Sequence, residues 1–303
     1  MAEAKNIAAQ RLARLDQTDW QDAGSTGTFL NGFAASVRDI WGHRELLGML
    51  TKRELKARYK DSTLGFLWSL ARPLTQLFIY YVVLGQFLGA ARNIPNFAIY
   101  IFAGLTVYTV FSEIVGAGTA SIVANAGLVK KVYLPREVFT LSSVGSSLFN
   151  FGIQFVILLI AAVVTGSLRL GPHLLYGVAG LVLVLVYAVA LGLLLGALNV
   201  FLRDIQYLVE VILMLVMWGS PIVYSWTQVQ NHLPGWLVQV YLNNPVTLSV
   251  IGFQEAFWSA GTPGTAPDAL FTRMVVAGLV GLVLLFVSQR IFSRLQGNFA
   301  QEL

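Results

Sequence analysis

Long apolar stretches alternate with short polar ones along most of this chain. A helix needs about 20 mainly apolar residues to cross the hydrocarbon core of a bilayer. Six stretches approach or exceed this length: residues 64–89, 97–122, 138–165, 174–201, 207–224 and 270–291. The pattern therefore predicts an all-α polytopic membrane protein with six transmembrane helices.

The stretch 225–268 has a different pattern. Its apolar pieces, 233–242 and 246–258, are each too short to span a bilayer, and Asn243-Asn244-Pro245 separates them. Short apolar pieces of this kind usually form re-entrant or interfacial helices, so we expect re-entrant helices between spans five and six. The alternative is a seventh span, which would move the C-terminus to the other side of the membrane.

The first 63 residues are mainly polar, and we divide the chain accordingly. Residues 1–35 are predicted to be a cytoplasmic N-terminal tail, 36–63 an amphipathic interface helix region, and 64–303 the six-span transmembrane domain.

Residues 42–60 contain no proline and many good helix formers. On a helical wheel the apolar arc holds Leu46, Leu47, Met49, Leu50 and Ala57. We expect a helix on the inner leaflet that a cytoplasmic partner can reach, and a helix that only anchors the chain to the lipid surface is the alternative.

The distribution of positive charge supports this topology. With the N-terminus inside, only Arg92, Arg169 and Arg273 of the 20 Lys and Arg residues lie away from the cytoplasmic segments and span ends. Cytoplasmic loops of membrane proteins carry such an excess of cations. Both termini are therefore predicted to be cytoplasmic.

Composition agrees with a membrane protein and argues against several other classes. The chain is 56% hydrophobic and only 12% charged, with a mean hydropathy of +0.68. The formal charge of +5 is not read as a nucleic-acid signal, because most cations sit beside apolar spans. With no cysteine, the chain has no thiolate nucleophile and no Cys-based metal site.

Motifs of catalysis are not found in the sequence. It lacks the G-x-x-x-x-G-K-[ST] phosphate loop and H-E-x-x-H, and His43, His173 and His232 are scattered. We expect no catalytic residue, no metal site and no ATPase site in this chain.

The loop 125–137 is a short, basic connector between the second and third spans. Its apolar side chains would be poorly placed in water: Leu128, Val129, Val132, Tyr133 and Leu134. Such a loop is suited to docking into a partner protein. A solvated, positively charged loop is the alternative.

Two ionisable residues lie deep inside predicted spans, where charge is costly. Arg72 and Glu113 each lie about 12–14 Å from the cytoplasmic end of their span at 1.5 Å per residue. We hypothesise that they pair or share one water-filled cavity. The alternative is a snorkelling Arg72 and a neutral, hydrogen-bonded Glu113.

Aromatic residues are abundant, and most fit the belt found at membrane interfaces. Some offer a flat face and a hydrogen-bonding tip to a sugar, and the mid-span candidates are Tyr80, Tyr81, Tyr108 and Trp218.

Four stretches together resemble the membrane subunit of polysaccharide ABC exporters, the family that carries O-antigen, teichoic-acid, capsule and cell-wall galactan precursors. They are ELKARYKDSTLGFLWSLARPL at 54–74, NAGLVKKVYLPREV at 125–138, LNVFLRDI at 198–205, and SPIVYSW at 220–226 with YLNNPVTLSVIGFQEAFW at 241–258. The loop 125–138 is the most specific match.

The resemblance implies a homodimer in the bacterial inner membrane, joined by two copies of a separate nucleotide-binding subunit that holds ATP and Mg. The chain itself would bind no cofactor and would export a polyprenyl-diphosphate-linked polysaccharide. A related ABC permease for drugs or lipids, and a membrane-embedded lipid-modifying enzyme, are the alternatives.

The resemblance also implies roles for individual residues. Coupling to the ATPase is expected at Leu128, Lys130, Lys131, Val132, Tyr133, Pro135, Arg136, Glu137, Arg53 and Arg58. The channel is expected to be lined by Trp68, Arg72, Tyr80, Tyr81, Tyr108, Glu113, Trp218 and Tyr224.

Overall fold

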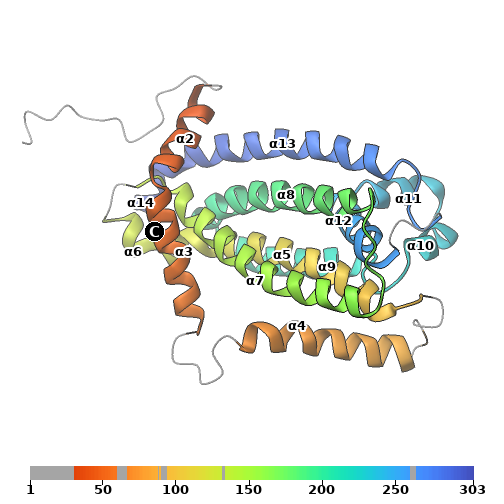
Figure 1. Ribbon diagram of the computed structural model, residues 1–303. Helices are drawn as coiled ribbons and strands as arrows, with labels where there is room; N and C mark the ends of the chain where they lie inside the picture. The colour runs from red at the N-terminus through yellow and green to blue at the C-terminus, as the bar shows by residue number, and fades with distance from the viewer. Residues whose placement is uncertain (1–30, 60–66, 88, 90–93, 132–133, 260–263) are drawn as a thin grey trace, which may run out of the picture.

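The computed structural model describes residues 31–59, 67–87, 89, 94–131, 134–259 and 264–303, apart from the side chains of Asn31, Tyr59 and Arg72. Within these ranges the regular structure is entirely helical (Figure 1). This confirms the all-α class that the apolar pattern predicts.

Within the described residues, five helices are long and apolar enough to cross a membrane. They are α4 (Leu67–Ile79) continued by the π-helical η1 (Tyr80–Phe87), α5 (Phe97–Ala124), α7 (Glu137–Val164), α8 (Leu174–Phe201) and α13 (Leu270–Leu295) with the residues that follow it. Their long axes run in roughly the same direction, with α4 at the edge (Figure 1). Five of the six predicted spans are therefore supported by length and composition.

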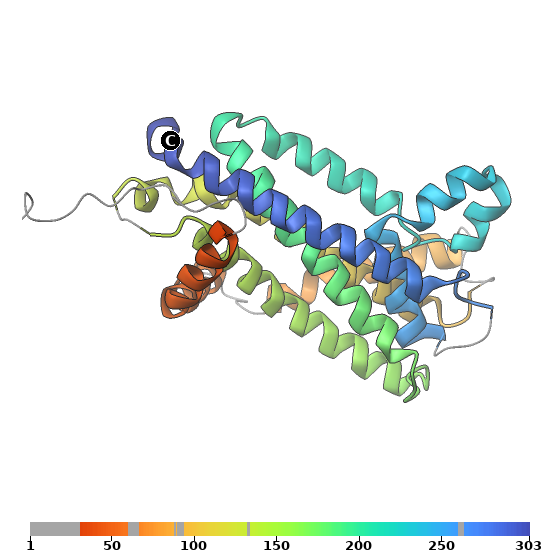
Figure 2. The ribbon, with the colours of Figure 1, turned by 90° about the horizontal axis from the view of Figure 1, so that it is seen from above.

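The fifth predicted span, 207–224, is shorter in the structure than the sequence suggests. Helix α9 (Ile205–Trp218) has 14 residues, which is about 21 Å of helix and less than a bilayer core requires. The helix ends at Trp218, and Gly219 is its C-cap. Pro221 follows two residues later, and proline is unfavourable inside an α-helix because it has no backbone N–H to donate. Figure 2 shows α9 in teal along one side of the bundle.

The segment after α9 forms short helices, as expected for 233–242 and 246–258. These are α10 (Trp226–His232), α11 (Gly235–Leu242), α12 (Pro245–Gln254) and the π-helical η3 (Glu255–Ser259). The break falls where the sequence predicts it, because Asn244 caps α12 by accepting from the Val246 backbone N–H at 2.9 Å, and Pro245 occupies the first turn. Neither piece reaches the length of a seventh span.

Two helices cross the other end of the bundle, α2 (Asn31–Gly42) and α3 (Arg44–Tyr59) (Figure 1). Residues 31–35, assigned above to a tail, belong to α2, and the Phe33 ring lies 5.4 Å from that of Phe286 on α13. Residues 1–30 lie outside the described part of the chain. We call this the α3 end, and the opposite one the α12 end.

The predicted apolar arc of the 42–60 helix is partly wrong. Leu50 is buried, and Leu46 and Leu47 pack beside it, but Met49 is 62% exposed and Ala57 is exposed. Helix α3 packs on α7 along a narrower line, where Thr51 contacts the backbone at Gly145. A narrow contact line covers only side chains spaced three or four residues apart.

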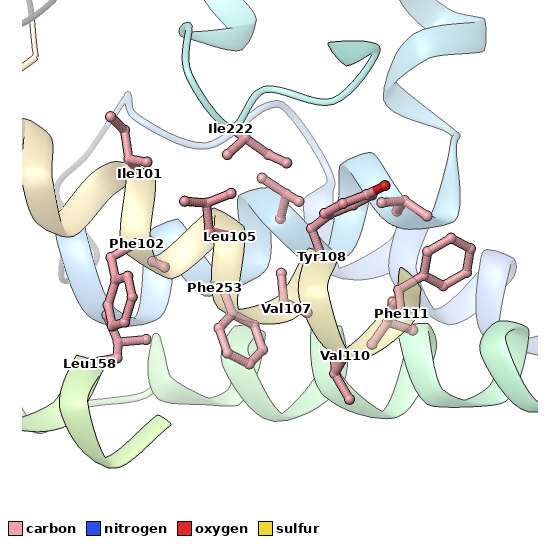
Figure 3. Close-up of a cluster of buried hydrophobic side chains, with 14 of the residues drawn as sticks. Ile101, Phe102, Leu105, Val107, Tyr108, Val110, Phe111, Leu158, Ile222 and Phe253 are labelled. Atoms are coloured by element: carbon pink, nitrogen blue, oxygen red, sulfur yellow. The ribbon is translucent and has the colours of Figure 1, made fainter. Parts of the chain in front are cut away.

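Helix α5 is the centre of the fold. In the most apolar 18-residue stretch of α5, 78% of the residues are buried. The corresponding share for the span that begins with α13 is 22%. Its side chains meet Leu158 of α7, Phe253 of α12 and Ile222 after α9 (Figure 3). Helices α5 and α8 approach closely because glycines face each other: a Cβ on Gly196 would lie 2.7 Å from the Gly118 carbonyl oxygen.

A separate apolar cluster holds the α3 end together. It joins Leu50 of α3, Val129 of the four-residue helix α6 (Ala126–Val129), Phe292 of α13 and Phe299 of α14 (Phe299–Glu302). The short helix η4 (Gln296–Asn298) leads into α14. Through this cluster α3, α6 and the last residues of the chain form one packed unit.

Candidate functional site

The basic loop at the α3 end presents its two lysines to the outside. Lys130 and Lys131 are exposed, directly after α6. Leu128 is partly buried and Val129 is buried in the cluster described above, so these apolar residues support the loop from within. Val132 and Tyr133, also predicted to dock, lie outside the described residues.

Helix α3 is tied to this loop by a direct polar contact. The Arg53 guanidinium donates to the side-chain oxygen of Asn125, the residue before α6. The Asn125 side-chain nitrogen in turn donates to the Ser121 carbonyl at 2.8 Å, at the end of α5. Arg53, predicted to contact the ATPase, thus holds the loop against α3.

The end of the loop is held by the last residues of the chain. The Arg136 guanidinium lies 5.9 Å from the centre of the Phe299 ring, within the range of a cation–π interaction. Phe299 is fully buried, and its ring packs edge-on against Phe292 at 5.5 Å. Pro135 and Arg136 are half-buried.

Glu137 lies inside the protein. It is 2% exposed and accepts a hydrogen bond from the Ser36 hydroxyl of α2 at 3.0 Å. As the first residue of α7, its carboxylate also sits at the positive end of a helix dipole. The Glu137 side chain therefore links α2 to α7. Because it is buried, it does not belong to the surface that Lys130 and Lys131 present.

Arg58, also predicted to dock, is directed into the bundle. Its guanidinium lies 3.8 Å from the Glu113 carboxylate of α5. The same carboxylate oxygen accepts from Asn150 Nδ2 of α7 at 2.9 Å. Three helices thus meet at one acidic side chain.

A polar cavity of about 290 Å³ opens at this point between α3, α4, α5 and α7. Its lining is Arg58, Trp68, Ser69, Pro73, Gln76, Thr109, Glu113, Asn150 and Gln154. Trp68 and Glu113, both predicted to line a channel, therefore share one cavity. The predicted pairing of Glu113 with Arg72 remains a prediction, because the Arg72 side chain lies outside the described residues.

The other predicted channel residues fall into two groups. On the α4 side, Tyr80 accepts from Gln76 Nε2 at 3.3 Å, and Tyr81 is 38% exposed. On the α9 side, the hydroxyl groups of Tyr108 and Tyr224 donate to backbone carbonyls of Leu213 and Trp218. Trp218 itself is half exposed. Tyr80 packs against the same apolar cluster that contains Tyr108, so these two predicted residues belong to one core.

A polar network at the α12 end was not predicted from the sequence. The Tyr100 hydroxyl lies 3.0 Å and 2.7 Å from the carbonyl oxygens of Pro221 and Tyr224. Gln254 Nε2 donates to the same Pro221 carbonyl at 2.7 Å. The network provides hydrogen-bond donors for carbonyl groups of the irregular segment that follows α9.

Glu255, directly after Gln254, is a buried carboxyl group. It is 3% exposed, and the Ser259 hydroxyl donates to it at 2.6 Å. Burial raises the pKa of Glu255, while hydrogen bonds from Ser259 and Thr265 and the charge of His173 act in the opposite direction.

Asn150 and Gln154 were also missed, although the sequence holds a signal for them. Polar residues recur through the third span at helical spacing, at Ser143, Ser147, Asn150 and Gln154. All four are buried, on one stripe of α7. A polar stripe in an apolar span indicates a face directed toward protein or water.

In the part of the chain that the structure describes, no three His, Cys, Asp or Glu side chains lie close enough together to hold a metal ion.

Known proteins resemble this chain over most of its length. Residues 45–258 match the family model described as "ABC-2 type transporter". The chain is 30% identical to the O-antigen export system permease protein RfbA of Myxococcus xanthus, over 88% of this chain and 98% of the relative. It is 26% identical to the protein of the same name from Klebsiella pneumoniae, over 85% and 94%.

A shorter match covers 25% of this chain and 30% of the polysialic acid transport protein KpsM of Escherichia coli, at 30% identity. The family match covers more than half of the chain, and the Myxococcus relative is matched over nearly its whole length. Together with several apolar helices, this makes the chain a multi-pass protein of the bacterial inner membrane. The chain belongs to the ABC-2 type transporter family.

Proposed function

We propose that this chain is the transmembrane subunit of an exporter that moves a polyprenyl-diphosphate-linked polysaccharide from the cytoplasm across the inner membrane. The observation that carries the proposal is the match to O-antigen export permeases over nearly their full length. An O-antigen-type polymer is therefore the first candidate cargo, with teichoic-acid and galactan precursors as related ones.

The energy for transport is proposed to come from two copies of a separate ATPase subunit, which bind ATP and Mg. Lys130 and Lys131 are the proposed contact, because they are exposed on a loop that is supported from behind by α3 and α14. A loop fixed in this way transmits a push from a partner to α5 and α7, the two helices that it connects.

A homodimer is the proposed assembly. In the single chain, four large side chains on one face of α9 are each more than half exposed: Tyr207, Leu208, Val211 and Leu215. Large side chains on α4 are exposed as well, including Trp68 and Phe78. A second copy of the chain is proposed to cover such faces, in place of lipid.

Co-purification tests the proposal. The chain, tagged and expressed with a candidate ATPase subunit, is expected to bring that subunit down and to raise its ATP hydrolysis. The double variant Lys130→Glu, Lys131→Glu is expected to reduce this stimulation at least several-fold without changing thermal unfolding of the chain, because it reverses the charge of the exposed loop.

Arg169→Glu is the matched control, since Arg169 is exposed in the loop between α7 and α8, away from the α3 end. If the double variant stimulates ATP hydrolysis as well as the wild type does, the docking assignment is wrong. If no ATPase is recovered, and cells lacking the chain still export their surface polysaccharide, the transporter function itself is contradicted.

A further inference from the structure

A second pocket, of about 310 Å³, lies near the α12 end between α7, α8, α12 and η3. None of the described residues that line it has a polar side chain. At 1.5 Å per residue, its lining extends about 10 Å along α8, from Leu174 to Leu181. An apolar space of this kind holds water poorly, because a water molecule would find no polar side chain to bond there.

Three phenylalanines line the inner side of this pocket. Phe253 and Phe257 are buried, and their ring centres lie 5.5 Å apart. The Phe155 ring of α7 meets both of them edge-on, at 6.5 Å and 5.4 Å. Because the rings support one another, the pocket has a firm wall that does not move inward to fill it.

The other side of the pocket reaches the outer surface of the bundle. Leu170 and Val178 line the pocket and are 91% and 62% exposed. The exposed apolar surface continues on α8 through Leu175 and Val182, which are also more than half exposed. In a multi-pass membrane protein, such a surface on a long apolar helix meets the hydrocarbon core of the bilayer.

A second copy of the chain seated on α9 would leave this surface uncovered. Figure 2 shows α9, in teal, and α7, in light green, on opposite sides of the bundle. The pocket lies on the α7 side, between α7 and α8. It therefore stays open to lipid when two chains meet through α9.

We infer that this pocket binds one acyl chain of a membrane phospholipid. Its volume lies near the lower end of ligand sites, which suits a single slender, unbranched chain. A polyprenyl chain carries methyl branches and is wider. The bound acyl chain contacts α7, α8 and η3 together, so it stabilises the packing of η3 on these two spans. The inference goes beyond the proposed function and does not depend on which polymer is exported.

The test uses the full chain in nanodiscs of phosphatidylethanolamine and phosphatidylglycerol, with a small share of phosphatidylethanolamine that carries a diazirine on one acyl chain. Light attaches this acyl chain to the residues that it touches, and mass spectrometry locates them. Adducts are expected on Leu174 and Leu181, which are only partly exposed and line the pocket. Val178→Trp places a large side chain at the opening and is expected to reduce these adducts about tenfold, because the site is then blocked.

Val182→Trp is the matched control, because Val182 is exposed one turn further along α8 and is not among the described residues that line the pocket. It is expected to leave the adducts on Leu174 and Leu181 unchanged. The inference is overturned if adducts occur only on exposed residues such as Leu175, or if Val178→Trp does not reduce them. Displacement of the labelled lipid by undecaprenyl phosphate, but not by unlabelled phosphatidylethanolamine, would assign the pocket to a polyprenyl chain and overturn it as well.

Two substitutions at Leu170 complete the test. Leu170→Trp blocks the same opening at a highly exposed position, and it replaces Val178→Trp if thermal unfolding shows that the latter does not fold. Leu170→Cys introduces a single thiol, since the chain has no cysteine. Ready formation of a disulfide between two copies of this variant in nanodiscs would show that a second chain covers the pocket, which contradicts a bound lipid.

Discussion

The Arg58 guanidinium lies 3.8 Å from the Glu113 carboxylate, which joins the helix that crosses the end of the bundle to its central helix. Both side chains are partly exposed, at 39% and 28%. An ion pair of this kind contributes at most about 1 kcal/mol. The hydrogen bond from Asn150 to the same carboxylate is better shielded, since Asn150 is 6% exposed.

This difference predicts the effects of two substitutions at Glu113. Glu113→Gln keeps an oxygen acceptor for Asn150 and loses only the ion pair, so we expect a cost below about 1 kcal/mol. Glu113→Leu also removes that acceptor, and we expect an additional loss of about 1–3 kcal/mol. Thermal unfolding of the purified chain in detergent measures both. The same substitutions at the exposed Glu210 of α9 are the control, and equal effects of Gln and Leu at position 113 would contradict the prediction.

Phe299 is expected to stabilise the α3 end. Its fully buried ring packs on Phe292 and Phe201 and lies beside Arg136. Replacing a buried phenylalanine by alanine removes apolar contacts and leaves a cavity, at a cost of about 3–5 kcal/mol.

We therefore expect Phe299→Ala to lower the unfolding temperature and to speed tryptic cleavage after Lys130 and Lys131. Phe78→Ala provides the comparison, because Phe78 is 65% exposed on α4. Unchanged cleavage at the loop in Phe299→Ala would show that the last helix does not support it.

The close contact between α5 and α8 predicts a strong effect of one methyl group. A Cβ at position 196 would lie 2.7 Å from a backbone oxygen, so the helices must separate to admit it. We expect Gly196→Ala to destabilise the chain by about 1–3 kcal/mol.

Gly278→Ala tests the same substitution in open space, since nothing lies within 4 Å of a Cβ there. Alanine favours a helix over glycine by up to about 1 kcal/mol, so this variant is expected to be neutral or slightly more stable. Thermal unfolding of both variants in one detergent decides the matter, and a Gly196→Ala protein as stable as the wild type would contradict the close packing of α5 on α8.

Glu255 predicts a dependence of stability on pH. Burial raises its pKa, so the folded state holds this proton more tightly than the unfolded chain does. The contribution of Glu255 to the free energy of unfolding is then fully favourable below the ordinary carboxyl pKa of 4.5. This contribution is lost as pH rises through the raised pKa of the folded state. Above the raised value the buried charge destabilises the fold.

We expect Glu255→Gln to raise the unfolding temperature by a few degrees at pH 8 and by less at pH 5. Gln keeps an oxygen for the Ser259 hydroxyl, so the comparison isolates the charge. Thermal unfolding at the two pH values measures the difference, with Glu210→Gln as the exposed control. If the substitution raised the unfolding temperature more at pH 5 than at pH 8, the predicted direction of the pH dependence would be wrong.

The apolar pattern was sufficient to predict most of the helices. Each long span must satisfy its backbone hydrogen bonds internally, and this local requirement is visible in the sequence. The break at Asn243-Asn244-Pro245 was predicted for a similar reason, because capping by Asn244 and the fixed ring of Pro245 act within a few residues. The end of α9 was misplaced, because the apolar residues after Pro221 pack into the core through Ile222 and need no helix to do so.

What the sequence by itself determined is the membrane class, the positions of the long helices and the basic loop at 125–137, since each follows from local composition. Which polar groups meet was decided only by the tertiary structure. Arg58 points to Glu113, Gln154 lines the same cavity, and Phe299 supports a loop more than 160 residues earlier in the chain. The physical reason is that helix packing sets the partner of a buried polar or aromatic side chain, and packing depends on residues far apart in sequence.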